Sequence, residues 1–220
     1  DMAPYPSPNG RFGTLPVPGF LFFLGIANFC IALLTVGAAL YIYINYQHPT
    51  FSPFATSISE VGASREWAAR ALNSGLLILG ALRFLFFYLL IRRYSMRDNR
   101  PNIRRIWLFL ALVETLGGIG VAMVPYSFNL TGHYIAAGTY FLGLTLMMGL
   151  LFWYEITMKV GRLLPATTLA VAIPPLVYLI LNTVLGIQKV AIWEWLAFAA
   201  LLCWELVHCL LLRNDFLEPE

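Results

Sequence analysis

Three ionisable residues, Arg83, Glu114 and Glu205, lie in the middle of long apolar stretches of this 220-residue chain. Arg83 and Glu114 are each about nine residues from one basic segment, so an antiparallel helix hairpin rising about 1.5 Å per residue would place them at the same depth. Glu205 and Asn28 fall close to that depth on two other stretches. We therefore expect a buried polar cluster, in which an Arg–Glu pair lowers the cost of burying each charge.

This expected cluster has two interpretations. Charges buried inside a membrane commonly mark a functional site, in which case Arg83, Glu114, Glu205 and Asn28 would bind a ligand. A structural role, in which the charged residues fix the register of neighbouring helices, is equally compatible with the sequence. For Asn28, a hydrogen bond between helices is the simpler interpretation.

A second group of polar residues lies near one end of the apolar stretches: His48, Ser57, Ser59, Glu60, His133 and Glu194. Histidine often acts as a general acid or base, and a neighbouring carboxylate can orient its imidazole. We predict His133 with Glu194 or Glu60 as the catalytic group. Glu194 and Glu205 are separated by about three helical turns, so they share one helix face, which His208 continues.

The same group allows other chemistries. A metal site formed by His48, Glu60 and His133 lacks an HExxH or comparable spacing, so we expect neither a metal nor a cofactor. Ser57 or Ser59 as the nucleophile of a hydrolase lacks a GxSxG setting. We expect both serines to contribute to ligand binding.

The elements that carry these residues are predicted to be transmembrane helices. Hydrophobic residues make up 60% of the chain and charged residues only 11%, with a mean hydropathy of +0.74, whereas soluble domains carry about 25% charged residues. The sequence predicts an all-α polytopic membrane protein with six transmembrane helices in one bundle. The predicted spans are residues 19–45, 72–92, 105–125, 133–155, 166–187 and 191–212.

Basic residues gather in the segments 92–105 and 159–162. The positive-inside rule places these segments, and with six crossings both termini, in the cytoplasm. We do not expect nucleic-acid binding, because no folded basic domain accompanies the basic residues.

The regions outside the spans are short. Residues 1–18 are a proline-rich arm expected to be extended, with no cleavable signal peptide, and residues 214–220 are a polar tail after the six-helix domain of 19–213. The long segment 46–71 is expected to end in a short amphipathic helix through Trp67. Pro174 and Pro175 are expected to kink the fifth span.

Several short motifs resemble a known family. The segments PFATSISEVG (53–62) and NLTGHYIAAGTYF (129–141), with Glu194-Trp195 at the start of the sixth span, are similar to the Frag/DRAM/Sfk superfamily of six-span membrane proteins. Arg83, Glu114, His133 and the two acids of the last span resemble its GPI-anchor lipid-remodelling branch. This resemblance implies a Golgi or other endomembrane protein that is needed for exchange of the acyl chains of GPI anchors.

We therefore expect a membrane protein that binds a lipid in a polar intramembrane cavity and assists its remodelling. In this hypothesis His133 removes a proton from a lipid hydroxyl, and Arg83, Glu114 and Glu205 shape the floor of the cavity. The alternative is a non-enzymatic accessory or scaffold subunit, whose partners would be proteins of a larger membrane complex. A transporter is less favoured, because no inverted repeat is evident.

Overall fold

The computed structural model describes residues 11–12, 15–64, 67–95, 101–185 and 191–213. Its helices are α1 (Val17–Tyr46), α2 (Ile58–Ala63), α3 (Trp67–Ser95), α4 (Pro101–Met123), α5 (Leu130–Thr157), α6 (Leu163–Leu179), the π-helix η1 (Ile180–Val184) and α7 (Ala191–Arg213). Two two-residue strands, β1 (Arg11–Phe12) and β2 (Leu15–Pro16), pair antiparallel before α1. The expected all-α architecture is confirmed.

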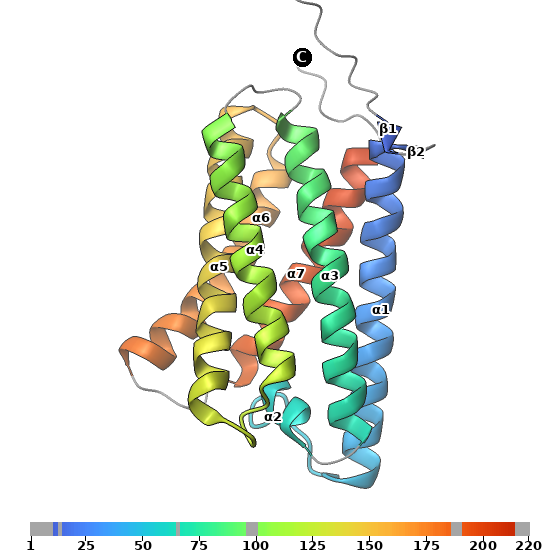
Figure 1. Ribbon diagram of the computed structural model, residues 1–220, viewed down its shortest axis with the longest axis vertical. Helices are drawn as coiled ribbons and strands as arrows, with labels where there is room; N and C mark the ends of the chain where they lie inside the picture. The colour runs from blue at the N-terminus through green and yellow to red at the C-terminus, as the bar shows by residue number, and fades with distance from the viewer. Residues whose placement is uncertain (1–10, 13–14, 65–66, 96–100, 186–190, 214–220) are drawn as a thin grey trace, which may run out of the picture.

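Six of the helices are long and apolar enough to cross a membrane, as the sequence predicts. Each packs on its neighbour in the order α1, α3, α4, α5, α6, α7, and α7 packs back on α1, so the six helices form a closed ring (Figure 1). The short helix α2 lies at the end of the bundle opposite the two strands. The chain is therefore an integral multi-pass membrane protein built as one bundle.

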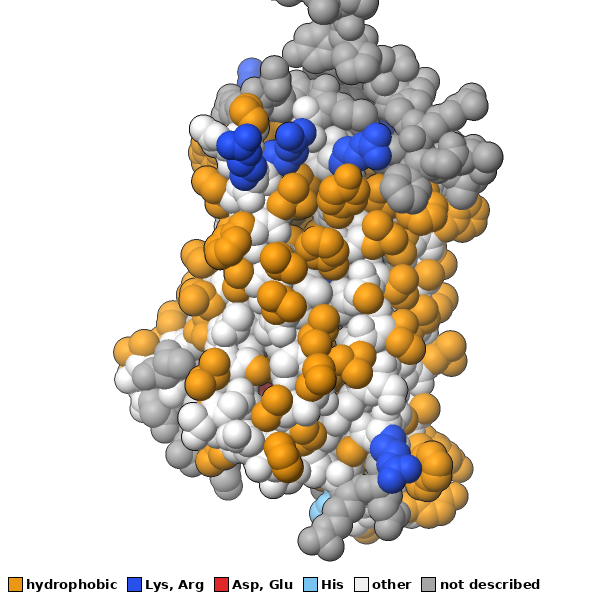
Figure 2. All heavy atoms as spheres, viewed as in Figure 1, with side chains coloured by type: hydrophobic (Ala, Val, Ile, Leu, Met, Phe, Trp, Pro, Cys, Tyr) orange, Lys and Arg blue, Asp and Glu red, His pale blue; other side chains and the backbone are white. Residues whose placement is uncertain are grey.

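The flank of the bundle is apolar and its ends are charged (Figure 2). Large apolar side chains such as Leu34, Phe109 and Leu116 are exposed on the flank, where lipid tails would cover them. Arg104, Arg105, Lys159 and Arg162 are exposed at one end, which we call the basic end. The other end, which carries α2, is called the α2 end.

Close approach of α4 and α5 depends on glycine. A Cβ atom added to Gly117 would clash with the backbone of Tyr140, and one added to Gly143 would lie 2.8 Å from the backbone nitrogen of Glu114. The absence of side chains at these two positions brings the backbone of α5 next to Glu114. The glycine-rich segment of α4 thus helps to position a site residue.

One local expectation is wrong. The short helix of the first loop spans Ile58–Ala63, where Ser57 and Glu60 form a capping box at its start, and Trp67 instead begins α3. The expected kink at Pro174 and Pro175 stays a prediction: α6 continues through both prolines and passes into the π-helix η1. In Figure 1 this end of α6 leans away from the bundle.

Candidate functional site

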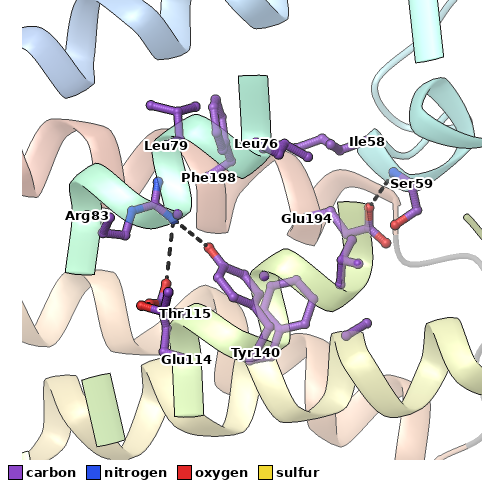
Figure 3. Close-up of a pocket in the computed structure, with 15 residues that line it drawn as sticks. Ile58, Ser59, Leu76, Leu79, Arg83, Glu114, Thr115, Tyr140, Glu194 and Phe198 are labelled. Atoms are coloured by element: carbon purple, nitrogen blue, oxygen red, sulfur yellow. Dashed lines mark hydrogen bonds and ion pairs between the residues drawn. The ribbon is translucent and has the colours of Figure 1, made fainter. Parts of the chain in front are cut away.

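A cavity of about 80 Å³ lies inside the ring, between α2, α3, α4, α5 and α7. Its two ends are polar and its middle is apolar (Figure 3). Arg83 and Glu114 line one end, and Ser59 and Glu194 line the other. The apolar wall is formed mainly by Leu76, Leu79, Val121, Ala137, Phe141 and Phe198.

Arg83 is the centre of the inner end. Its Nε donates to Glu205 Oε1 at 2.9 Å, and its Nη1 lies 3.5 Å from Glu114 Oε1. The same Nη1 donates to the Tyr140 hydroxyl at 3.4 Å, and Thr115 donates to the second oxygen of Glu114 at 3.3 Å. Helices α3, α4, α5 and α7 therefore meet at the guanidinium of Arg83. Only 6% of the surface of this residue is exposed.

One nitrogen of Arg83 remains without a hydrogen bond. Asn28 of α1 is fully buried and lies within reach of a side-chain hydrogen bond to Glu205. Nη2 of Arg83 has no hydrogen-bond partner within the described part of the chain. Buried polar atoms are nearly always satisfied, so this end of the cavity offers a donor to a polar group.

His133 and Ser59 meet at the α2 end. The imidazole Nδ1 lies 2.8 Å from the carbonyl oxygen of Val124, and Nε2 lies 3.2 Å from Ser59 Oγ. A carbonyl oxygen can only accept, so Nδ1 carries the proton, and in the neutral ring Nε2 accepts from the serine hydroxyl. His133 is 4% exposed, which shields this contact from water.

The start of α7 holds Ser59 in place. Glu194 accepts a hydrogen bond from the backbone N–H of Ser59 at 3.1 Å. The hydroxyl of Ser59 and the phenol of Tyr178 also lie against this carboxylate. The next residue, Trp195, donates from its indole to the carbonyl of Thr56 at 2.8 Å. Two consecutive side chains of α7 thus fix the backbone at the start of α2.

Ser57 and Glu60 hydrogen-bond to each other at the start of α2. Glu60 Oε2 accepts from the backbone N–H of Ser57 at 2.6 Å, and Ser57 Oγ accepts from the N–H of Glu60 at 3.1 Å. This capping box fixes the first turn of α2. The imidazole of His133 is oriented by a backbone carbonyl, rather than by the carboxylate of Glu60 or Glu194.

Sequence reasoning missed a buried polar network near the basic end. Glu155 Oε1 lies 2.9 Å from His208 Nε2 and accepts from the Tyr94 hydroxyl at 3.0 Å, and Glu155 and His208 are both fully buried. His208 Nδ1 contacts the carbonyl of Trp204 at 3.1 Å and must donate to it. One proton therefore lies between His208 and Glu155. The signal was present in the sequence, because Glu155 is an acid at the end of an apolar span.

Within the described ranges, no group of three or more histidine, cysteine or acidic side chains is arranged to hold a metal ion. Comparison of the chain with models of protein families, with curated proteins and with solved structures finds no match. The chemistry of the site has to be inferred from its own residues. Of these, the hydroxyl of Ser59 against the base of His133 is the arrangement with the clearest reactivity.

Proposed function

We propose that this protein transfers acyl chains between membrane lipids, with Ser59 as the nucleophile and His133 as the general base. The observation that carries the proposal is the hydrogen bond between Ser59 Oγ and His133 Nε2, with Nδ1 held by the carbonyl of Val124. A nucleophile, a base and a group that orients the base are the three parts of an activated serine. Here the nucleophile lines an apolar cavity inside a membrane protein.

The reaction has two halves. As Ser59 Oγ attacks the carbonyl carbon of a lipid ester, its proton passes to His133 Nε2 and then to the departing lipid alcohol, which leaves an acyl group on Ser59. In the second half a lipid with a free hydroxyl gives its proton to His133 and attacks the acyl-serine. The acyl group moves to the new lipid, and Ser59 regains its proton.

The size and polarity of the cavity fit the reacting end of a lipid. Pockets that enclose a whole drug-sized ligand measure about 300–1,000 Å³, so a cavity of about 80 Å³ takes the ester and adjoining carbons rather than a whole chain. Ser59 lies at one end of it, and the apolar wall leads to Arg83 at the other. The unpaired Nη2 of Arg83 would donate to a polar group of the same lipid.

The resemblance to the Frag/DRAM/Sfk superfamily suggests which lipid is used. Its lipid-remodelling branch implies the acyl chains of GPI anchors as substrate and the Golgi as location. We include both in the proposal. The residues of the site support acyl transfer as a class of reaction, and the resemblance supports the particular lipid.

The test uses the full chain in nanodiscs, with a phospholipid carrying a labelled acyl chain as donor and a lysolipid as acceptor. Ser59→Ala should abolish transfer, and His133→Asn should lower it by about 100-fold or more, because asparagine can still donate to the Val124 carbonyl but supplies no base. In single turnover without acceptor, the native chain should gain the mass of one acyl group on Ser59. Ser74→Ala, on the exposed face of α3, is the matched control and should transfer normally.

Full transfer activity in Ser59→Ala would exclude the acyl-serine. The scaffold alternative would be favoured if the chain shows no transfer activity and co-purifies with other membrane proteins in a fixed ratio. These partners should then also co-purify with the Ser59→Ala and His133→Asn variants.

A further inference from the structure

A second, open pocket of about 510 Å³ lies at the α2 end, separate from the buried cavity. Three aromatic rings and one carboxylate dominate its wall. The residues that line it are Tyr43, Gln47, His48, Glu60, Ala63, Ser64 and Tyr126. It shares no lining residue with the cavity that contains Ser59.

The carboxylate of Glu60 lacks a cationic partner in the described part of the chain. Its Oε2 accepts from the backbone of Ser57 at 2.6 Å, and no described lysine or arginine forms an ion pair with it. Burial, and then the charge of Glu60, raise the pKa of the Tyr126 phenol, so this ring stays neutral beside the acid. A half-buried negative charge beside a neutral aromatic ring is a place where a cation gains free energy.

The rings are held in place by packing. Tyr43 lies against His48 with ring centroids 4.7 Å apart, and Tyr126 meets the ring of His133 edge-on at 5.9 Å. Tyr43 is buried, so its position is fixed by α1. Aromatic faces together with a carboxylate are the chemistry that recognises alkylammonium groups.

We infer that this pocket binds the alkylammonium group of a phospholipid headgroup. Glu60 supplies the charge, Tyr126 supplies an aromatic face, and the buried ring of Tyr43 forms part of the wall. The lipid source rests on the proposed function: Glu60 directly follows Ser59 in α2, and Tyr126 contacts His133. A headgroup in this pocket would therefore lie next to the residues that attack the ester of the same lipid.

Glu60→Gln removes the charge with little change to the fold. The glutamine oxygen can still accept from the backbone of Ser57, because a capping box tolerates either residue at this position. Tyr126→Leu removes one ring, and Tyr126→Phe keeps it. These variants therefore test the contributions of the charge and the ring to binding without disrupting α2.

The experiment measures binding to the purified full chain in a non-ionic detergent, by saturation-transfer NMR and calorimetry. The probes are choline, its neutral isostere 3,3-dimethylbutan-1-ol, and dihexanoylphosphatidylcholine. Choline should bind at least about tenfold more tightly than the neutral isostere, and Glu60→Gln should remove most of that difference. Tyr126→Leu should weaken choline binding about fivefold, whereas Tyr126→Phe should leave it within about twofold of native.

Equal binding of choline and its neutral isostere, or unchanged choline binding in Glu60→Gln, would overturn the inference. Dihexanoylphosphatidylcholine should bind more tightly than choline. Equal affinity would mean that the pocket recognises a soluble amine and not a lipid headgroup. The inference and the proposed function fail separately. Ser59→Ala should lose transfer activity and keep choline binding. A native chain that transfers acyl groups but binds choline and its neutral isostere equally would count against the pocket alone.

Discussion

Ser59 Oγ and His133 Nε2 lie 3.2 Å apart, although the two residues are 74 positions apart in the chain. Ser59 is in the short helix α2, between α1 and α3, and His133 is in the first turn of α5. The segment that contains α2 is held by side chains from three directions: Asn73 donates to Gly62, Ser127 to Ala63 and Trp195 to Thr56. A reactive serine on such a short helix needs these attachments, because catalytic geometry is lost by displacements of about 1 Å.

Glu194 should act by positioning Ser59. We expect Glu194→Gln to keep transfer activity within about threefold, because the amide oxygen can still accept from the Ser59 backbone. Glu194→Ala should lower kcat by about tenfold or more while changing KM little, because substrate contacts remain but the serine is no longer fixed. Hydrogen exchange over 56–63 should be faster in the alanine variant only. Equal loss in both variants would mean that the charge of Glu194 takes part in the reaction.

Removing Arg83 alone should destabilise the protein, whereas replacing Arg83, Glu114 and Glu205 together should be tolerated. Arg83→Met leaves Glu114 and Glu205 buried without their cation, and we expect a loss of about 3–5 kcal/mol. Changing all three residues to methionine should recover most of this stability, because no charge then remains buried without a partner. Melting temperatures in detergent compare the two variants.

Lipid transfer separates the two interpretations of this cluster. If Arg83, Glu114 and Glu205 bind the polar part of a lipid, the triple methionine variant should be stable but inactive. A triple variant that is both stable and active would show that the cluster serves the packing of the helices alone.

The sequence predicted the depth of the charged residues better than their partners. Counting from the basic segments placed Arg83, Glu114 and Glu205 at one level, because helical rise converts sequence distance into depth. It could not find Tyr140, because rotation about the axis of α5 decides which side of that helix faces Arg83. Rotation is set by packing, here by the backbone contacts at Gly117 and Gly143.

The α2 end was less predictable for a related reason. Ser59, His133 and Glu194 were recognised as polar residues near one surface, but the carbonyl of Val124 has no side-chain signal in a sequence. Glu60 was assigned to catalysis because it is an acid near a histidine. The capping-box spacing of Ser57 and Glu60 was present in the sequence and indicates the local role that the structure shows.

Glu155 and His208 should stabilise the protein as a unit. Each single variant, Glu155→Gln or His208→Phe, leaves a fully buried polar group without its partner, so both should lower the melting temperature. The double variant should be destabilised by less than the sum of the two, with a coupling energy of about 0.5–3 kcal/mol. Tyr134→Phe, on the exposed face of α5, is the control. Strict additivity would contradict a shared proton between the pair.

The basic end should face the cytoplasm. Arg104 is exposed at that end, and Phe128, in the turn between α4 and α5, is exposed at the α2 end. In a variant whose three native cysteines are replaced by alanine, Arg104→Cys should react with a membrane-impermeant maleimide added from the cytoplasmic side, and Phe128→Cys only after the membrane is permeabilised. The opposite pattern would place Ser59 and the ammonium pocket in the cytoplasmic leaflet. Substrate would then have to enter from that side, so the same labelling experiment fixes the leaflet from which lipid is drawn.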